Sequence, residues 1–199
     1  MTAPRSATIE RTTNEVKVTL SIDLDGTGRT SVDTGVPFLD HMLDQLGRHG
    51  RFDLDVKADG DLHIDSHHTI EDIGIALGQA LGEALGDKSG LTRFADATSP
   101  LDEARAKVVV DISGRPYLVW DVPVTPGWPG ELGNLDPRQV KHFLEGLVVN
   151  ARITLHVLLE AGELPHHCLE ACFKALARAL RAATRPNPTA GSGSTKGIL

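Results

Sequence analysis

Hydrophobic and polar residues alternate along residues 18–26 and again along residues 108–114, and each of these stretches ends in a glycine-containing turn. Alternation with a period of two predicts half-buried β-strands. Apolar stretches at residues 52–64 and 153–159 predict one further strand in each half of the chain. Between these strands, apolar residues at helical spacing predict one helix in each half.

A second helix in each half is predicted to start with nearly the same sequence. The two copies read His67-His68-Thr69-Ile70-Glu71 and His166-His167-Cys168-Leu169-Glu170. Sequence rich in alanine and leucine follows both copies, so the order strand, strand, helix, strand, helix occurs twice. A repeat of about 90 residues is too long for a solenoid, whose repeats span roughly 20–50 residues. We therefore predict an α+β fold made of two similar, fused halves.

Changes in composition predict the boundaries of these halves. Residues 1–8 have the composition of a flexible leader, and residues 9–97 and 98–184 form the two α/β halves. Residues 185–199 are rich in proline, glycine, serine and threonine, which predicts a mobile C-terminal tail. A stretch rich in proline and glycine, residues 121–137, predicts a loop that is inserted in the second half only.

Composition and charge exclude several classes of protein. The 199 residues are 40% hydrophobic and 24% charged, as is usual for a globular protein, and the net charge of −7 argues against a general nucleic-acid binder. No apolar run approaches the roughly 20 residues of a membrane helix, and the N-terminus lacks the apolar core of a signal peptide. We therefore expect a cytoplasmic protein. Cys168 and Cys172, four residues apart on one predicted helix, suit core packing better than a disulfide.

The two duplicated motifs are candidates for metal binding. Residues three or four apart share one face of a helix, whereas adjacent residues diverge by about 100°. Glu71 can therefore join either His67 or His68, while the two histidines point in different directions. Each motif can thus serve two metal ions, or one metal ion and a substrate. Imidazole and carboxylate ligands without a thiolate favour manganese, iron or zinc.

The number of candidate ligands suggests how they divide between two metal sites. Six histidines and two glutamates in the repeated elements suggest a pair of sites with three imidazoles and one carboxylate each. These candidate ligands are His41, His67, His68, Glu71, His142, His166, His167 and Glu170. Three further histidines lack the support of the repeat, and we interpret them as structural: His49, His63 and His156.

Several cations and hydroxyl groups are candidates for binding a phosphomonoester, which guanidinium, ammonium, hydroxyl and free amide groups recognise. They are Arg93, Arg115, Lys174, Ser194, Thr195 and Lys196. Lys174 lies four residues after Glu170 and therefore on the same helix face as that motif. The sequence does not show whether these groups converge.

Ordered motifs along nearly the whole chain resemble imidazoleglycerol-phosphate dehydratase of histidine biosynthesis. The motifs are Arg11-Thr12-Thr13-Asn14-Glu15, Gly35-Val36-Pro37-Phe38-Leu39-Asp40-His41-Met42-Leu43, His67-His68-Thr69-Ile70-Glu71-Asp72, Leu85-Gly86-Asp87-Lys88, Pro100-Leu101-Asp102-Glu103, Ser113-Gly114-Arg115-Pro116-Tyr117, His166-His167 with Glu170, and Ser194-Thr195-Lys196-Gly197.

This resemblance implies a lyase that converts imidazole glycerol phosphate to imidazole acetol phosphate and water, through an imidazolate and a diazafulvene-like intermediate. It implies two Mn²⁺ ions per active site and the eight ligands named above, of which His67, Glu71, His166 and Glu170 are also expected to be catalytic. Glu15 is expected beside the glycerol carbons as the base that removes the proton. The six phosphate candidates are expected to bind the substrate phosphate, with the tail closing over it.

The resemblance also implies an architecture. Each half is expected to be a four-stranded mixed sheet with helices packed on one face. The chains are expected to assemble into a 24-subunit homo-oligomer with active sites between subunits, without nucleic-acid or membrane partners. Three positions depart from the usual pattern: Gly193 before the Ser-Thr-Lys of the tail, Leu164-Pro165 before the second histidine pair, and Ala95 after Arg93-Phe94.

Two other functions compete with the dehydratase. A structural or storage oligomer stapled by metal ions explains the duplicated ligands, but it does not explain Glu15 or the Ser-Thr-Lys-Gly tail. A di-metal hydrolase acting on a phosphoester usually has bridging carboxylates that hold its metals about 3.5–4 Å apart. Here imidazoles dominate and no bridging aspartate is evident, so the dehydratase is favoured.

Overall fold

The computed structural model describes residues 4–123, 128 and 130–189, and in this part of the chain it has eight strands and four helices. The first half contains β1 (Ser6–Thr12), β2 (Val16–Asp23), β3 (Thr30–Asp33), α1 (Pro37–Gly50), β4 (Asp53–Gly60) and α2 (His67–Leu85). The second half contains β5 (Phe94–Leu101), β6 (Ala104–Asp111), β7 (Tyr117–Asp121), α3 (Gln139–Ala151), β8 (Thr154–Ala161) and α4 (Pro165–Ala183).

The two sheets have the same topology, which confirms the predicted duplication. Their strand orders are β1-β2-β4-β3 and β5-β6-β8-β7. Both sheets are mixed, because β3 pairs in parallel with β4, and β7 with β8, while the other pairs are antiparallel. Each half has three strands before its first helix instead of the predicted two. The short β3 and β7, four and five residues long, offer too few positions for alternation to reveal them.

The beginning of the chain also differs from the prediction. Residues 6–8, which composition assigned to a leader, belong to β1, because Ser6 pairs with Asp23 of β2 and the pairing continues to Thr12. The predicted tail likewise starts in an ordered segment. Backbone hydrogen bonds join Arg185 to Thr92 and Asn187 to Gly90.

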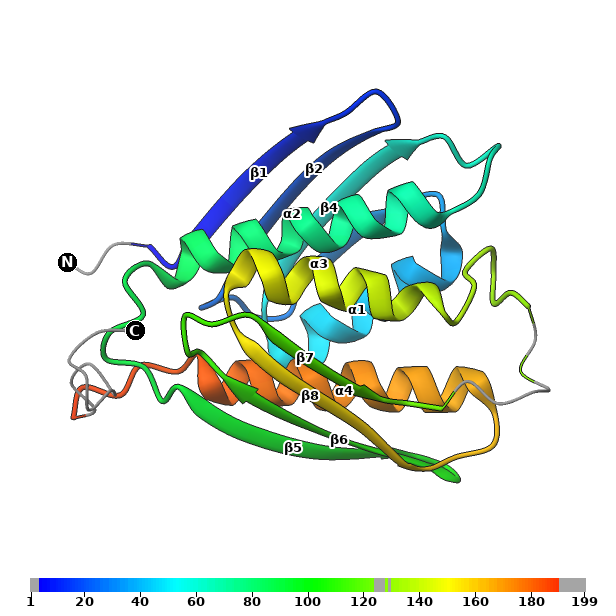
Figure 1. Ribbon diagram of the computed structural model, residues 1–199. Coiled ribbons are helices and arrows are strands. Elements are labelled where there is room, and N and C mark those ends of the chain that lie inside the picture. The colour runs from blue at the N-terminus through cyan, green and yellow to red at the C-terminus, as the bar shows by residue number, and fades with distance from the viewer. Residues whose placement is uncertain (1–3, 124–127, 129, 190–199) are drawn as a thin grey trace.

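All four helices lie in one layer between the two sheets (Figure 1), so helices cover a single face of each sheet as predicted. In the first half α2 packs on β1 and β2, and in the second half α4 packs on β5 and β6. Alternation along the strands supplies the apolar faces; in β2 the residues Val16, Val18 and Leu20 are buried. None of the helices in the described residues is both long and apolar enough to cross a bilayer.

Helix contacts join the two halves across the layer. Helix α2 packs against α3, and α1 packs against α4, so one continuous apolar core extends from sheet to sheet. Three glycines allow a close approach of α2 and α3: Gly74 and Gly78 on α2 and Gly146 on α3. A Cβ at Gly74 would lie 2.3 Å from the carbonyl oxygen of Phe143, and one at Gly78 would lie 2.6 Å from that of Leu147.

Substituting Gly74 by alanine is therefore expected to destabilise the fold. The new methyl group would meet the backbone of α3, which has to move away, and overpacking of this kind costs about 1–3 kcal/mol. Gly82→Ala on the same helix is the control, because its Cβ would lie 3.3 Å from the nearest atom and alanine favours helix by up to about 1 kcal/mol. Thermal denaturation should show a lower Tm for Gly74→Ala alone. Equal Tm values would contradict the close helix packing.

The two cysteines are core residues. Cys168 and Cys172 are free and buried, as predicted, and a Cβ at Gly162 would lie 2.4 Å from the sulfur of Cys168. Thr69, the equivalent residue after the first histidine pair, packs in the same way against Gly60. Cys168 therefore has a packing role that the duplication explains.

Buried thiols should be chemically inert. Burial raises the pKa of the Cys172 thiol to about 12 and also raises the pKa of Cys168. Because the thiolate is the reactive form, the folded protein should not react with a thiol-specific disulfide reagent at pH 8, whereas the protein in guanidinium chloride should react at both cysteines. Rapid labelling of the folded protein would contradict the burial of these side chains.

Candidate metal centre and active site

The candidate ligand outside the motif in each half, His41 or His142, lies beside the motif of the other half. His41 of α1 contacts His166 of α4, with ring centroids 5.5 Å apart. His142 of α3 contacts His67 of α2, with ring centroids 5.2 Å apart. Each of these histidines meets the motif of the other half because α1 packs against α4 and α3 packs against α2 in the helix layer. Each candidate site is thus built from both halves of the chain.

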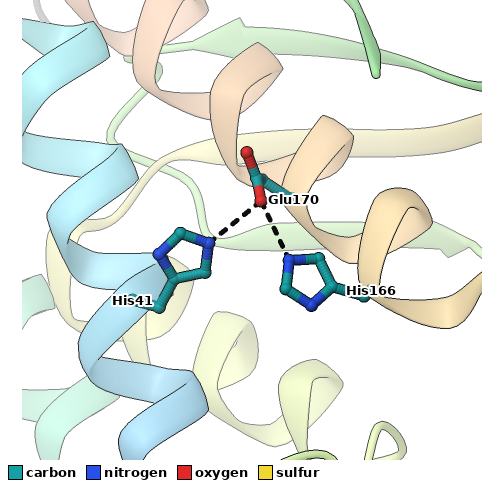
Figure 2. Close-up of side chains that lie close together, drawn as sticks. All are labelled: His41, His166 and Glu170. Atoms are coloured by element: carbon teal, nitrogen blue, oxygen red, sulfur yellow. Dashed lines mark hydrogen bonds and ion pairs between the residues drawn. The ribbon is translucent and has the colours of Figure 1, made fainter. Parts of the chain in front are cut away.

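Around the second motif the side chains form a compact cluster (Figure 2). The Nε2 atoms of His41 and His166 lie 2.9 and 3.1 Å from the same oxygen, Oε2 of Glu170. His166 and Glu170 are four residues apart on α4 and therefore share a face. Among the described residues, these three alone bring three candidate ligand atoms within 4.8 Å of one another. Two imidazoles and a carboxylate directed at one point fit a manganese, iron or zinc ion.

Glu170 is held in the ionised form that a metal requires. Its side chain is largely buried, and Lys174 forms an ion pair with its other oxygen. Burial by itself raises the pKa of Glu170, but the hydrogen bonds from Lys174 and His41 outweigh burial and lower that pKa to about 2. The prediction that Lys174 lies on the motif-bearing face agrees with this contact.

The first motif is arranged differently. The Glu71 side chain is exposed, and Nδ1 of His142 lies 3.3 Å from Glu145. The position equivalent to Lys174 is Ile75, which cannot hold the carboxylate of Glu71 as Lys174 holds Glu170. The chain therefore preassembles one of the two predicted clusters, and it brings His67 and His142 together in the other.

The second histidine of each pair diverges from the first and has a carboxylate of its own. His68 Nδ1 lies 3.0 Å from Asp61, and His167 Nδ1 lies 2.7 Å from Glu103. The hydrogen bonds that the two histidines donate to these carboxylates raise the pKa of both histidines, and the one donated by His167 lowers the pKa of Glu103 to about 2. A carboxylate on Nδ1 fixes the ring and leaves Nε2 to bind a metal.

Sequence reasoning assigned no role to Asp61 or Glu103. Glu103 belongs to a motif that carried the resemblance, but a carboxylate before a turn is usually a solvated charge. Asp61 directly follows β4, the strand that leads to α2, whereas Glu103 lies in the turn between β5 and β6. Because Asp61 and Glu103 lie on different elements of their halves, comparison of the two motifs alone did not reveal them.

Glu15 lies at the hairpin between β1 and β2, close to His68 of the first motif. Its Oε1 is 3.8 Å from Nε2 of His68, and its side chain is 55% exposed. Asp102, at the equivalent hairpin between β5 and β6, has its Oδ2 3.9 Å from Nε2 of His167. Glu15 also lines a hollow of about 270 Å³ that includes His63. A carboxylate in this position can exchange a proton with a ligand bound at the neighbouring imidazole.

Of the phosphate candidates in the described residues, Arg93 and Arg115 lie together and apart from Lys174. Arg93 and Arg115 both contact Asp111, at 2.8 and 3.7 Å. The backbone of Arg93 is hydrogen-bonded to Ala183 at the end of α4, nine residues after Lys174, and this length of helix spans about 13 Å. Three further candidates lie outside the described residues: Ser194, Thr195 and Lys196.

Comparison with known proteins decides the family. The family model described as imidazoleglycerol-phosphate dehydratase matches residues 34–180. The chain belongs to the imidazoleglycerol-phosphate dehydratase family. It is therefore an enzyme of the hydro-lyase class, as predicted. Imidazoleglycerol-phosphate dehydratase of Gluconacetobacter diazotrophicus is 53% identical over 201 residues and covers 100% of both chains. That of Kineococcus radiotolerans is 57% identical over 198 residues, which are 98% of this chain and 99% of the relative.

Solved imidazoleglycerol-phosphate dehydratases have the same fold. The enzyme of Staphylococcus aureus matches with a TM-score of 0.81 and 38% identity over 92% of this chain and 99% of that one. The enzyme of Pyrococcus furiosus matches with a TM-score of 0.81 and 38% identity over 96% of this chain and 100% of that one. The predicted fold class is therefore confirmed by relatives as well as by the arrangement of the two sheets.

Proposed function

We propose that this chain dehydrates imidazole glycerol phosphate to imidazole acetol phosphate in histidine biosynthesis, and that the reaction depends on two Mn²⁺ ions per active site. The observation that carries the proposal is the cluster of His41, His166 and Glu170, built from both halves of a member of this family. The related proteins support the reaction, and the donor set supports a metal ion. In keeping with this biosynthetic role, we propose a cytoplasmic location.

The proposed ligands divide into two sets related by the duplication. One set is His41, His166 and Glu170, and the other is His67, Glu71 and His142. We propose that His68 and His167 complete these sets in another copy of the chain, because each diverges from the first histidine of its own pair. A bound Mn²⁺ would act as a Lewis acid on the imidazole ring of the substrate and favour its imidazolate form.

An active site between subunits is supported by the separation of the proposed binding residues. Lys174 lies beside Glu170, whereas Arg93 and Arg115 lie near the other end of α4. One phosphate cannot contact groups so far apart in a single chain. We therefore propose that the phosphate is bound by Lys174 of one subunit and by Arg93, Arg115 and the tail of other subunits, in a 24-subunit assembly.

The proposed chemistry assigns the orientation of the substrate and the removal of the proton to residues of this chain. The phosphate-binding cations orient the substrate from a distance, so that the glycerol carbons lie beside Glu15. The hydroxyl next to the ring leaves together with the proton that the ring nitrogen has given up, so water is released. The substrate is then in a diazafulvene-like form whose neighbouring C–H is acidic. The carboxylate of Glu15 takes that proton, and the resulting enol becomes the ketone.

Product analysis tests this proposal against its two alternatives. Purified protein with Mn²⁺ and imidazole glycerol phosphate should form imidazole acetol phosphate with the phosphate retained. Release of inorganic phosphate would instead identify a hydrolase of the di-metal type. An unchanged substrate in the presence of bound metal would identify a structural or storage oligomer.

A further inference from the structure

A buried ion pair joins the hairpin that carries Glu15 to the helix that carries the first histidine motif. Asp72, the residue after Glu71 on α2, accepts a hydrogen bond of 3.0 Å from Nε of Arg11 on β1. The Nη2 atom of Arg11 lies 2.9 Å from the same oxygen. The Asp72 side chain is only 10% exposed and that of Arg11 30%, so the pair is shielded from solvent.

Thr13 continues this connection to Glu15. Its hydroxyl oxygen lies 3.4 Å from the other oxygen of Asp72 and 3.3 Å from the carbonyl oxygen of Val16, so its one proton can be donated to either. The same hydroxyl oxygen accepts from the backbone N–H groups of Glu15 and Val16, at 3.2 and 3.0 Å. On the far side of the hairpin, the backbone N–H of Asp61 donates to the carbonyl of Glu15 over 3.1 Å. The backbone of Glu15 is thus held from both sides.

The second half of the chain lacks this pair. The helix position equivalent to Asp72 is Ala171, because Glu71 and Glu170 correspond in the two motifs. The second hairpin is instead attached by Arg178 of α4, whose Nη1 donates to the carbonyl of Thr98 and lies 3.3 Å from Oγ of Ser99. The two halves therefore attach their equivalent hairpins in different ways, and the arginine–aspartate pair is found at the hairpin that carries Glu15.

We infer that Asp72, acting through Arg11 and Thr13, is a positioning residue that fixes the carboxylate of Glu15 over His68. This inference rests on the proposed function, in which Glu15 takes the proton. The carboxylate has an exposed side chain on a hairpin, so its position depends on the backbone that bears it. A displacement of about 1 Å in a reacting group can reduce a rate by about 100-fold.

Asp72→Asn is the direct test. Asparagine keeps the shape of the side chain but cannot accept from Arg11 and Thr13 as an ionised carboxylate does. We expect kcat to fall by about 10- to 100-fold with KM and Mn²⁺ content unchanged. Hydrogen–deuterium exchange of the amides of residues 13–16 should become faster. Asp53→Asn is the matched control, because Asp53 of β4 forms an ion pair with Arg29 outside the proposed site. The kcat of this variant should not change.

Two further variants make the outcome decisive. Thr13→Val breaks the connection without leaving a charge unpaired, so it tests the same link should Asp72→Asn fold poorly, and it should also lower kcat. In a Glu15→Gln background, Asp72→Asn should cause no further loss. The positioning role alone would be overturned if Asp72→Asn kept the kcat and the amide hydrogen–deuterium exchange rates of the unmodified protein while Glu15→Gln was inactive. Full activity of Glu15→Gln would instead overturn the proposed role of Glu15, and the exchange measurement would still decide whether Asp72 holds the hairpin.

Discussion

Glu15→Gln is expected to lower kcat by about 10²- to 10⁴-fold, the usual contribution of a general base, while Mn²⁺ content stays unchanged. Glutamine fills the same space on the hairpin but cannot take a proton. The proposed base is 3.8 Å from His68 and is not one of the proposed metal ligands, so removing its charge should leave both ligand sets intact. Steady-state kinetics and metal analysis of the same preparation measure the two effects.

The neighbouring carboxylate on the same strand pair offers a control for this prediction. Glu10 lies on β1, where it pairs with Thr19 of β2, and it has no part in the proposed site. Glu10→Gln should therefore retain the kcat of the unmodified protein. Full activity of Glu15→Gln would exclude Glu15 as the base, and loss of metal together with activity would show that Glu15 contributes to metal binding instead.

His41→Ala is expected to weaken Mn²⁺ binding by at least about 100-fold, because loss of even an outer partner of a ligand costs 10- to 100-fold in affinity. His41 is the proposed ligand from α1 in a cluster whose other members are on α4, so its loss would leave His166 and Glu170 with an incomplete set. Titration calorimetry with Mn²⁺ measures the change in affinity, and turnover at limiting Mn²⁺ should fall in parallel.

His156→Ala is the matched control for this second prediction. His156 is half-buried on β8, opposite Val109 and Val119 of the adjacent strands, and it takes no part in the cluster. Its replacement should leave Mn²⁺ affinity unchanged. Equal affinities of His41→Ala and the unmodified protein would remove His41 from the proposed ligand set.

Much of the fold was predictable because its elements each have one buried face. Alternation marked β2 and β6, and helical spacing marked all four helices, since every helix lies in a layer covered by a sheet. The short parallel strands β3 and β7 were missed, and β1 was partly assigned to a leader. Their positions depend on pairing with strands distant in sequence, which local patterns do not record.

The sequence indicated candidate ligands for the site but not their arrangement. The spacing of His166 and Glu170 placed both on one helix face, and the duplication pointed to His41 and His142. Each of these two histidines contacts the motif of the other half because of the way the helices pack together, and that packing follows from the whole fold. The difference between Glu71 and Glu170 reflects the neighbours of Glu170, among them Lys174, whose counterpart Ile75 is apolar.

The most direct test of the account is turnover of imidazole glycerol phosphate by metal-stripped protein, before and after titration with Mn²⁺. The account predicts that imidazole acetol phosphate forms only after Mn²⁺ is added, and that activity saturates as the imidazole–carboxylate sites fill. Full turnover by protein shown to be free of metal would contradict the metal-dependent mechanism. Absence of product at saturating Mn²⁺, with the metal bound, would contradict the proposed dehydratase activity itself.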